Sequence, residues 1–258
     1  MSLLEIESVS VSFGGLAALK RVSFAIEARE IVGLIGPNGA GKTTLFNCVT
    51  GFQPVSEGRI RFRGVPVETL APHQVAALGV ARTFQTSRIF RRMTVLDHLL
   101  IGQHLHQRAG LWAAMTRLPW VGREERQARE RGLKTLALFE DRLLPRIHDS
   151  ADTLSYANRR RLEIARALAA EPTLLLLDEP TAGMNPHESQ GIVQLIKTIR
   201  DLGTTVLLIE HDMKVIMGAS DRIVVLDHGE KIAEGLPEEV RRNEEVIQAY
   251  MGGRRGRA

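Results

Sequence analysis

Residues 36–44 read Gly-Pro-Asn-Gly-Ala-Gly-Lys-Thr-Thr (GPNGAGKTT), and this stretch decides the fold of the chain. It matches G-x-x-x-x-G-K-[ST], the pattern of a phosphate-binding loop, or P-loop. Residues 30–35 before it, apolar after Glu30, predict a buried strand, and residues 42–49 predict a helix that ends near Gly51. Strand, glycine-rich loop and helix in this order are the context that the motif requires. The alternative, a glycine-rich turn with a surface lysine, does not explain that context.

The residue types of the loop predict how it would bind a nucleoside triphosphate. Glycines let the backbone turn its N–H groups inward around phosphate oxygens, and the helix N-terminus adds its positive dipole end. Lys42 can reach the β- and γ-phosphates, and the Thr43 hydroxyl can ligate Mg²⁺. The predicted nucleotide-binding residues of the loop are Gly36, Pro37, Asn38, Gly39, Ala40, Gly41, Lys42, Thr43 and Thr44.

Composition restricts the class of protein. The 258 residues, 44% of them hydrophobic, are enough for one large domain or a domain with a subdomain. The one cysteine, Cys48, excludes a disulfide framework within the chain, fits a reducing compartment and is expected to be a small core residue. The formal charge of +4 is nearly balanced, and basic clusters such as residues 159–161 are more often solvated faces than lipid or nucleic-acid sites.

The sequence also predicts how the chain relates to membranes. Its first ten residues, MSLLEIESVS, lack the basic region and apolar run of a signal peptide. No apolar stretch reaches the roughly 18 residues that a membrane-spanning helix needs. We therefore expect a soluble or peripheral protein.

Hydrophobic patterning divides the rest of the chain. Alternating residues at 4–13, 22–26 and 59–62 predict an antiparallel sheet beside the nucleotide core. Buried strands at 173–177 and 204–209, with intervening helices, predict parallel crossover connections. The remaining predicted elements are helices 72–78, 156–170, 186–202 and 237–250, a strand 80–84, and a hairpin of 221–226 with 231–233.

A helical block interrupts this α/β pattern. Thr94 and Asp97 predict a capped helix start, residues 110–122 are apolar and broken by Pro119 and Gly122, and residues 123–140 predict an amphipathic helix. We interpret the block up to about residue 150 as a separate helical subdomain.

A second chemical cluster follows a buried strand. Residues 174–180 read LLLLDEP, which places two carboxylates at the carboxyl edge of the sheet, where ligands bind in open α/β folds. Asp178 is expected to hold Mg²⁺ through water, and Glu179 is expected to act as the general base on the attacking water. Helix N-cap chemistry is the alternative, and the position directly after four leucines argues against it.

At residues 154–169 the chain reads LSYANRRRLEIARALA, and here it resembles the ATP-binding-cassette (ABC) ATPase family, whose signature is LSGGQ followed by such a helix. The resemblance covers the whole chain through six motifs in the family's order. It implies that Phe13 stacks on adenine, that Gln85 senses Mg²⁺ and the attacking water, and that His211 contacts the γ-phosphate. It assigns residues 182–185 to the D-loop. Taken singly, Phe13 could instead be a core residue, Gln85 a solvated loop residue and His211 a histidine at the end of a strand.

The signature departs from the family's usual sequence. Tyr156, Ala157 and Asn158 stand where the family usually has Gly, Gly and Gln, and Asn185 replaces the frequent Asp of the D-loop. Ser155 and the helix N-terminus remain, so the resemblance still implies a phosphate-binding end. Ala157 adds a methyl group where the backbone is expected to approach ATP, which leaves the affinity and rate of that site open.

The resemblance implies an α/β fold with a P-loop NTPase core, a mostly parallel sheet, an antiparallel β-subdomain and a helical subdomain. Residues 1–258 are then a single ABC ATPase domain, in which 1–93 and 151–258 form the nucleotide-binding core with the β-subdomain and 94–150 form the helical subdomain. The implied cofactors are ATP and Mg²⁺.

Three longer stretches, 81–104, 208–235 and 246–252, resemble the ATP-binding subunits of branched-chain amino-acid importers, as does the insertion that carries Trp112 and Trp120. Related ATPases of urea and amide import and of lipopolysaccharide export share parts of this pattern. The resemblance implies a peripheral subunit on the cytoplasmic face of the cell membrane, where transmembrane permease subunits and, indirectly, a periplasmic binding protein would be its partners.

The resemblance also implies a second ATPase subunit, because the P-loop and the signature of one cassette cannot close on one ATP. Ser155 and Ala157 would complete the partner's site. The importers that this chain resembles usually pair two different ATPase chains, so we favour a heterodimer, with a homodimer as the alternative. Ile89, Phe90 and Met93 are either the permease socket or subdomain core. The two tryptophans are expected to pack on the subdomain rather than against bilayer or permease.

Two other classes of protein compete with this interpretation. Soluble ABC ATPases that act on DNA or ribosomes carry long coiled coils, zinc cysteines or tandem cassettes, and the sequence shows none of these, so no nucleic-acid partner is expected. A nucleotide-binding regulator without turnover would not need the four residues that predict hydrolysis, Lys42, Asp178, Glu179 and His211.

Overall fold

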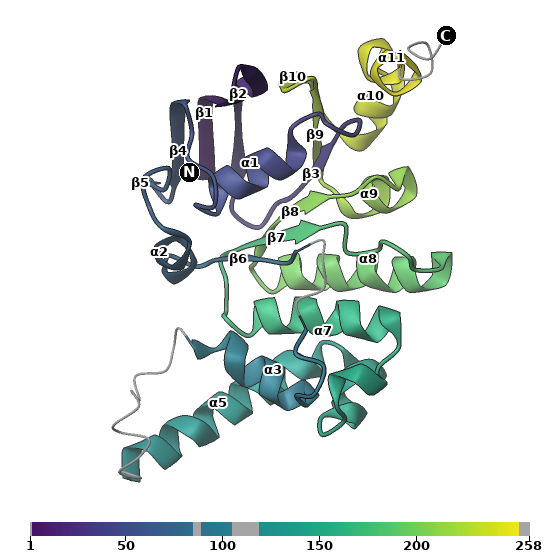
Figure 1. The fold of residues 1–258 in the computed structure, drawn as a ribbon. Coiled ribbons are helices and arrows are strands. Elements are labelled where there is room, and N and C mark those ends of the chain that lie inside the picture. Colours follow the sequence, from purple (N-terminus) through teal and green to yellow (C-terminus); the bar gives the residue numbers. More distant parts are fainter. Residues whose placement is uncertain (1, 85–88, 105–118, 253–258) are drawn as a thin grey trace.

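The computed structural model describes residues 2–84, 89–104 and 119–252, and its centre is a six-stranded sheet (Figure 1). The strand order is β10-β9-β3-β8-β7-β6, in which β10 is antiparallel to β9 and the other neighbours are parallel. These strands are β3 (Ile31–Ile35), β6 (Val80–Arg82), β7 (Leu174–Asp178), β8 (Thr205–Ile209), β9 (Arg222–Asp227) and β10 (Glu230–Gly235). The predicted α/β fold with a mostly parallel sheet is confirmed.

A second sheet is antiparallel and has the order β2-β1-β4-β5. Its strands are β1 (Ser2–Phe13), β2 (Leu16–Glu27), β4 (Glu57–Phe62) and β5 (Val65–Pro66). It lies beside α1 in Figure 1, on the side of the parallel sheet away from α8. The sequence predicted three of these strands, and the antiparallel β-subdomain is confirmed.

The parallel sheet is buried on both faces, as β3 shows. Ile31 and Ile35 join an apolar cluster with α7, α8 and α9, whereas Val32 and Leu34 join a second cluster with α1 and the antiparallel sheet. Because successive side chains of a strand point to opposite faces, a strand covered on both sides must be continuously apolar.

The helices are α1 (Lys42–Val49), α2 (Pro72–Ala77), α3 (Val95–Gly102), α5 (Pro119–Ala137), α6 (Glu140–Leu143), α7 (Tyr156–Leu168), α8 (Pro186–Asp201), α9 (Met213–Ala219), α10 (Pro237–Arg242) and α11 (Glu244–Gly252), with 3₁₀ turns η2 (Leu144–Arg146) and η3 (Ala151–Thr153).

The helical block begins where the sequence predicted. Thr94 Oγ1 accepts from the Asp97 N–H at 3.1 Å, and Asp97 Oδ2 accepts from the Thr94 N–H at 2.9 Å, so the capping box is present. Pro119 does not break a helix but begins α5, where its missing N–H has no helical partner to lose. Helices α3 and α5 pack on α7, which the prediction assigned to the core, so the division at residues 94 and 150 stays a prediction.

One prediction about the C-terminal third was wrong, and one helix there was missed. Residues 237–250 form two helices rather than one, because Asn243 is extended and its Oδ1 accepts from the Glu245 and Val246 N–H groups at 2.9 and 3.2 Å, which starts α11 anew. Helix α9 was not predicted. It follows Asp212, whose side chain accepts from the Lys214 N–H at 2.8 Å.

Candidate functional site

The predicted phosphate-binding loop connects β3 to α1 at the carboxyl edge of the parallel sheet. Gly36 and Gly41 have φ angles of 149° and 100°, and a Cβ atom would lie 2.0 Å from the Leu226 carbonyl oxygen at Gly36 and 2.6 Å from the Ala18 carbonyl oxygen at Gly41. Both positions therefore require glycine. Within the described part of the chain no side chain caps α1, so the N–H groups of its first turn remain available to an anion.

Lys42 brings the loop and the predicted carboxylates into one site. Its Nζ donates to the carbonyl oxygens of Gly36 and Pro37 at 2.6 and 2.9 Å, which folds the side chain back over the loop. Burial lowers the pKa of Lys42, while the charges of Glu179 and Asp178 raise it. The lysine therefore lies within the electrostatic reach of both acids, although they follow a different strand.

Other residues of the loop differ in exposure. Asn38, Gly39 and Thr43 are exposed, Pro37 and Thr44 are half-buried, and Ala40 is buried with its N–H donating to the Pro37 carbonyl oxygen at 3.1 Å. The exposed Thr43 lies in the first turn of α1, at the end of the helix that faces the loop.

Asp178 is held by an arginine that the sequence analysis did not single out. Arg82 Nη2 lies 3.1 Å from Asp178 Oδ2, and the two side chains are only 6% and 4% exposed. Burial raises the pKa of Asp178, and Arg82 lowers it. Arg82 also donates to Asn47 Oδ1 at 2.6 Å, and its guanidinium lies 5.4 and 5.1 Å from the ring centroids of Phe46 and Phe84. The signal available in the sequence was an arginine inside the predicted strand 80–84.

Glu179 and His211 come from neighbouring strands and meet at the sheet edge. Glu179 follows β7 and His211 follows β8, and the distance from His211 Nδ1 to Glu179 Oε1 is 3.5 Å. Glu179 has a φ of 48°, a left-handed conformation that costs a non-glycine residue about 1–3 kcal/mol. Its N–H donates to the Ile209 carbonyl oxygen at 2.9 Å, so the backbone of β8 fixes this conformation.

Buried Glu210 connects the two segments that carry these residues. Its Oε1 accepts from the N–H and the hydroxyl of Thr181 at 2.9 and 2.6 Å, and its Oε2 accepts from the His211 N–H at 3.3 Å. A buried acid that binds both segments sets their separation. Sequence reasoning missed Glu210 because only the register of β7 and β8 reveals that the segments are adjacent.

The remaining predicted residues lie in different settings. Phe13 is 48% exposed at the end of β1, and Ser155 is exposed at the start of α7, where its Oγ accepts from the Asn158 N–H at 3.3 Å. Ala157 is only 4% exposed, so its methyl group packs inside the protein rather than on the open surface. Gln85 lies outside the described residues. These geometries leave the roles of the four residues as predictions.

An apolar cleft of about 380 Å³ is lined by residues of α2, β6, α3 and α7. Its wall includes Phe52 and Phe84, which meet edge to face at a centroid distance of 5.8 Å, and it reaches Ile101 on α3. Of the predicted socket residues, Phe90 and Met93 are 53% and 38% exposed, whereas Ile89 packs against the core. Trp112 lies outside the described residues, as does the side chain of Trp120.

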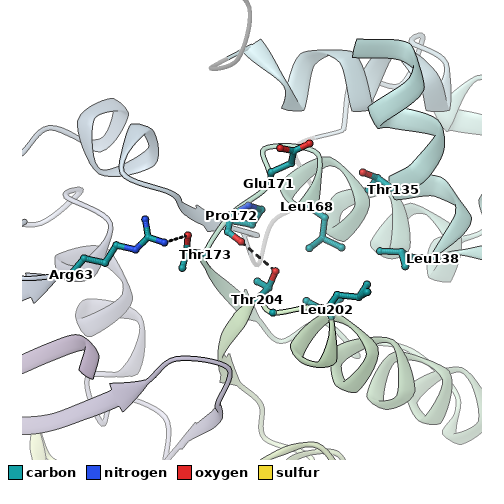
Figure 2. A pocket seen from close by; sticks show the side chains of 11 residues that line it. Arg63, Thr135, Leu138, Leu168, Glu171, Pro172, Thr173, Leu202 and Thr204 are labelled. Atoms are coloured by element: carbon teal, nitrogen blue, oxygen red, sulfur yellow. Dashed lines mark hydrogen bonds between the residues drawn. The ribbon is translucent and has the colours of Figure 1, made fainter. Parts of the chain in front are cut away.

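A further cavity, of about 430 Å³, lies at the opposite edge of the sheet (Figure 2). Thr173 and Thr204 line it directly before β7 and β8, and Arg63 Nη2 donates to Thr173 Oγ1 at 2.8 Å. Since the phosphate-binding loop and both acids lie at the carboxyl ends of the strands, this cavity is not part of that site.

The fold and the site together define a P-loop ATPase: a glycine-rich loop before a helix, a lysine folded over it, and two carboxylates and a histidine converging from adjacent strands. No helix of the described residues has both the length and the apolar character needed to cross a membrane.

Comparisons with known proteins agree with this class and refine it. A family model described as ABC transporter matches residues 19–182, and one described as branched-chain amino acid ATP-binding cassette transporter matches residues 230–255. The high-affinity branched-chain amino acid transport ATP-binding protein LivG of Salmonella typhimurium is 46% identical over 251 residues, 97% of this chain and 98% of LivG. The chain belongs to the ABC transporter family, as an ATP-binding subunit with ATPase activity.

Solved structures show the same fold. The ADP conformation of the ATP-binding cassette MJ1267 matches with a TM-score of 0.85 and 32% identity, over 98% of this chain and 99% of that one. The dimeric post-hydrolysis state of the cassette MJ0796, bound to ADP and Pi, matches with a TM-score of 0.74 and 25% identity, over 91% and 98%. Members of this family thus bind nucleotide with this fold.

Proposed function

We propose that this chain binds and hydrolyses ATP to power a membrane importer of branched-chain amino acids. The observation that carries the proposal is that the loop with Lys42, and the carboxylates Asp178 and Glu179, stand at the carboxyl ends of strands of one parallel sheet. The cargo class rests on the similarity to LivG and on the C-terminal match, since the site itself handles only nucleotide.

The loop residues Gly36 to Thr44 would hold the phosphates of ATP. Lys42 Nζ, which now binds two carbonyl oxygens of its own loop, would exchange them for β- and γ-phosphate oxygens, a stronger charge-assisted pairing. The half-exposed ring of Phe13 would stack on the adenine base.

The residues present fit Mg²⁺. The described residues contain no group of three or more His, Cys, Asp or Glu side chains that could hold a metal alone. A hydroxyl from Thr43 and a carboxylate from Asp178 suit Mg²⁺, which keeps several waters and is held largely by substrate phosphates. When bound, the ion would neutralise phosphate charge, and Gln85 would sense it.

Glu179 would accept a proton from the water that attacks the γ-phosphate. The geometry supports this role because its carboxylate is partly exposed, lies 3.5 Å from His211 and is held by a constrained backbone. His211, 3.5 Å from that carboxylate, would contact the γ-phosphate and orient it for attack.

Two substitutions separate binding from hydrolysis. Lys42→Ala should remove most affinity for a fluorescent ATP analogue, because the phosphates lose their charged partner. Glu179→Gln should keep that affinity and slow hydrolysis by about 10²–10⁴-fold, the usual contribution of a positioned base. Glu171→Gln is the matched control, since Glu171 lines the cavity at the opposite edge of the sheet. Wild-type affinity in the first variant or wild-type turnover in the second would contradict the assignment.

Two partners complete the proposal. Ser155 would reach the γ-phosphate on a second, different ATPase chain, and Ala157 would shape the same helix start from inside. Permease subunits on the cytoplasmic face of the membrane would dock at the apolar cleft and the exposed Phe90, and a periplasmic binding protein would act through them. Phe90→Asp should weaken co-purification with the permease without changing nucleotide affinity. Leu202→Asp, at an even more exposed apolar residue at the other edge of the sheet, should not weaken it. Undiminished co-purification of the Phe90 variant would place the docking surface elsewhere.

A further inference from the structure

The tyrosine of the signature lies against the loop that follows the catalytic carboxylates. A Cβ atom on Gly183 would lie 3.1 Å from Tyr156 Cε1 and 3.5 Å from Tyr156 Cζ, and the φ of Gly183 is 73°. The ring therefore occupies the space that a side chain at position 183 would need. Tyr156 is 48% exposed, so part of the ring also faces solvent.

A buried arginine holds this ring in place. Arg160 Nε donates to Tyr156 Oη at 3.3 Å, and the guanidinium carbon lies 5.6 Å from the ring centroid. Arg160 is itself fixed, because its Nη1 pairs with Glu163 at 3.0 Å and donates to the Phe84 carbonyl oxygen at 3.3 Å. The tyrosine thus rests on a fixed arginine that also binds the segment between β6 and Gln85.

The loop that the ring contacts is bonded directly to Glu179. The Ala182 N–H donates to the Glu179 carbonyl oxygen at 3.2 Å, and the Met184 N–H donates to the Thr181 carbonyl oxygen at 3.0 Å. Glu179 is in the left-handed conformation, which persists only where the surroundings fix it. One side of this turn is fixed by Glu210 through Thr181, and Tyr156 covers the other side at Gly183.

We propose that Tyr156 is a positioning residue: its ring packs on the D-loop, residues 182–185, fixes the conformation of that loop and thereby holds the backbone of Glu179. A glycine, which the family usually has at this position, offers no ring to make the contact. The unusual signature would therefore supply a contact within one subunit in addition to its role toward the partner's nucleotide. The proposal rests on the role of Glu179 given above.

Hydrogen exchange and kinetics test the proposal together. In Tyr156→Ala, the amides of Ala182 and Met184 should exchange about tenfold faster, because the turn loses its cover. The assembled transporter should lose about three- to tenfold in kcat, since small displacements of a catalytic group are expensive. Nucleotide affinity of the isolated subunit should not change. Tyr156→Phe keeps the ring over Gly183 and should retain most of both properties.

Leu202→Ala is the control for truncating an exposed apolar side chain away from the site. Unchanged exchange of the two amides in Tyr156→Ala would overturn the proposal, and faster exchange with unchanged kcat would overturn its link to Glu179. If Glu179→Gln instead hydrolysed ATP at the wild-type rate, the role assigned to Glu179 would be wrong. Hydrogen exchange in Tyr156→Ala would still test the contact between Tyr156 and the D-loop.

Discussion

Replacing Arg82 by methionine should destabilise the folded protein strongly. Methionine fills much of the space of the arginine stem but removes the charge, so Asp178 is left as an unpaired carboxylate that is 4% exposed. Breaking a buried ion pair by removing one partner costs about 3–5 kcal/mol. The hydrogen bond to Asn47 and the contacts with two aromatic rings are lost as well, so the loss of unfolding free energy should lie within that range rather than below it.

The penalty should depend on pH in a defined direction. Burial already raises the pKa of Asp178, and loss of Arg82 raises it further. When the pKa of an acid is higher in the folded than in the unfolded state, the free energy of unfolding of the protein falls as pH rises through the interval between the two pKa values. The difference in unfolding free energy between the variant and wild type should therefore grow as pH rises from the unfolded-state pKa of aspartate towards neutrality.

Urea unfolding, followed by circular dichroism, measures this free energy. Asp178→Asn combined with Arg82→Met should be more stable than Arg82→Met alone by more than about 1 kcal/mol, because the buried charge is gone. Arg63→Met is the control, since Arg63 is exposed but also lies over a phenylalanine ring. A loss below 1 kcal/mol in Arg82→Met, or no recovery in the double variant, would refute the reasoning.

Three further predictions follow from single side chains. Cys48 is buried, and burial raises its pKa to about 12. A maleimide should therefore not label Cys48 at pH 8 in the native protein but should label it fully in urea. Labelling of the native protein would contradict this burial. His98 Nε2 accepts from the Phe90 N–H at 3.1 Å, and burial lowers the pKa of His98. The free energy of unfolding should therefore fall as pH drops below the unfolded-state pKa of about 6.5, by up to about 1.4 kcal/mol per pH unit, and His98→Leu should lack this dependence. Parallel pH profiles of the two proteins would exclude this role. Ser155→Ala loses a helix cap worth about 1 kcal/mol. It should slow ATP hydrolysis by the assembled transporter about 10- to 100-fold, while the nucleotide affinity of the isolated subunit is kept. A normal rate of hydrolysis by the assembled transporter would mean that Ser155 does not serve the partner's site.

Elements set by local pattern could be predicted closely from the sequence. The P-loop helix, residues 42–49, has the predicted bounds, because a buried strand, glycines and a lysine allow few alternatives. The parallel strands were predicted within a residue or two, since burial on both faces demands continuous apolar runs.

Features set by one side chain or by contacts between distant segments were not predicted. Asn243 divides the last helix through its own side chain, and a helical pattern does not reveal such a break. The partners of Asp178 and Glu179 depend on which strands are neighbours, so Arg82 and Glu210 became visible only in the sheet. The burial of Ala157 likewise comes from packing, and it means that Ala157→Asp would disturb the interior of the subunit before it affected a nucleotide.

The most direct test of the proposed function is ATP hydrolysis by the complete transporter, reconstituted in proteoliposomes with its permease, its second ATPase chain and its binding protein. Leucine-loaded binding protein should stimulate hydrolysis and drive leucine uptake, and both should fall by about 10²–10⁴-fold with Glu179→Gln in this subunit. A rate of hydrolysis that is the same with and without a branched-chain amino acid, or uptake that survives the substitution, would contradict the account.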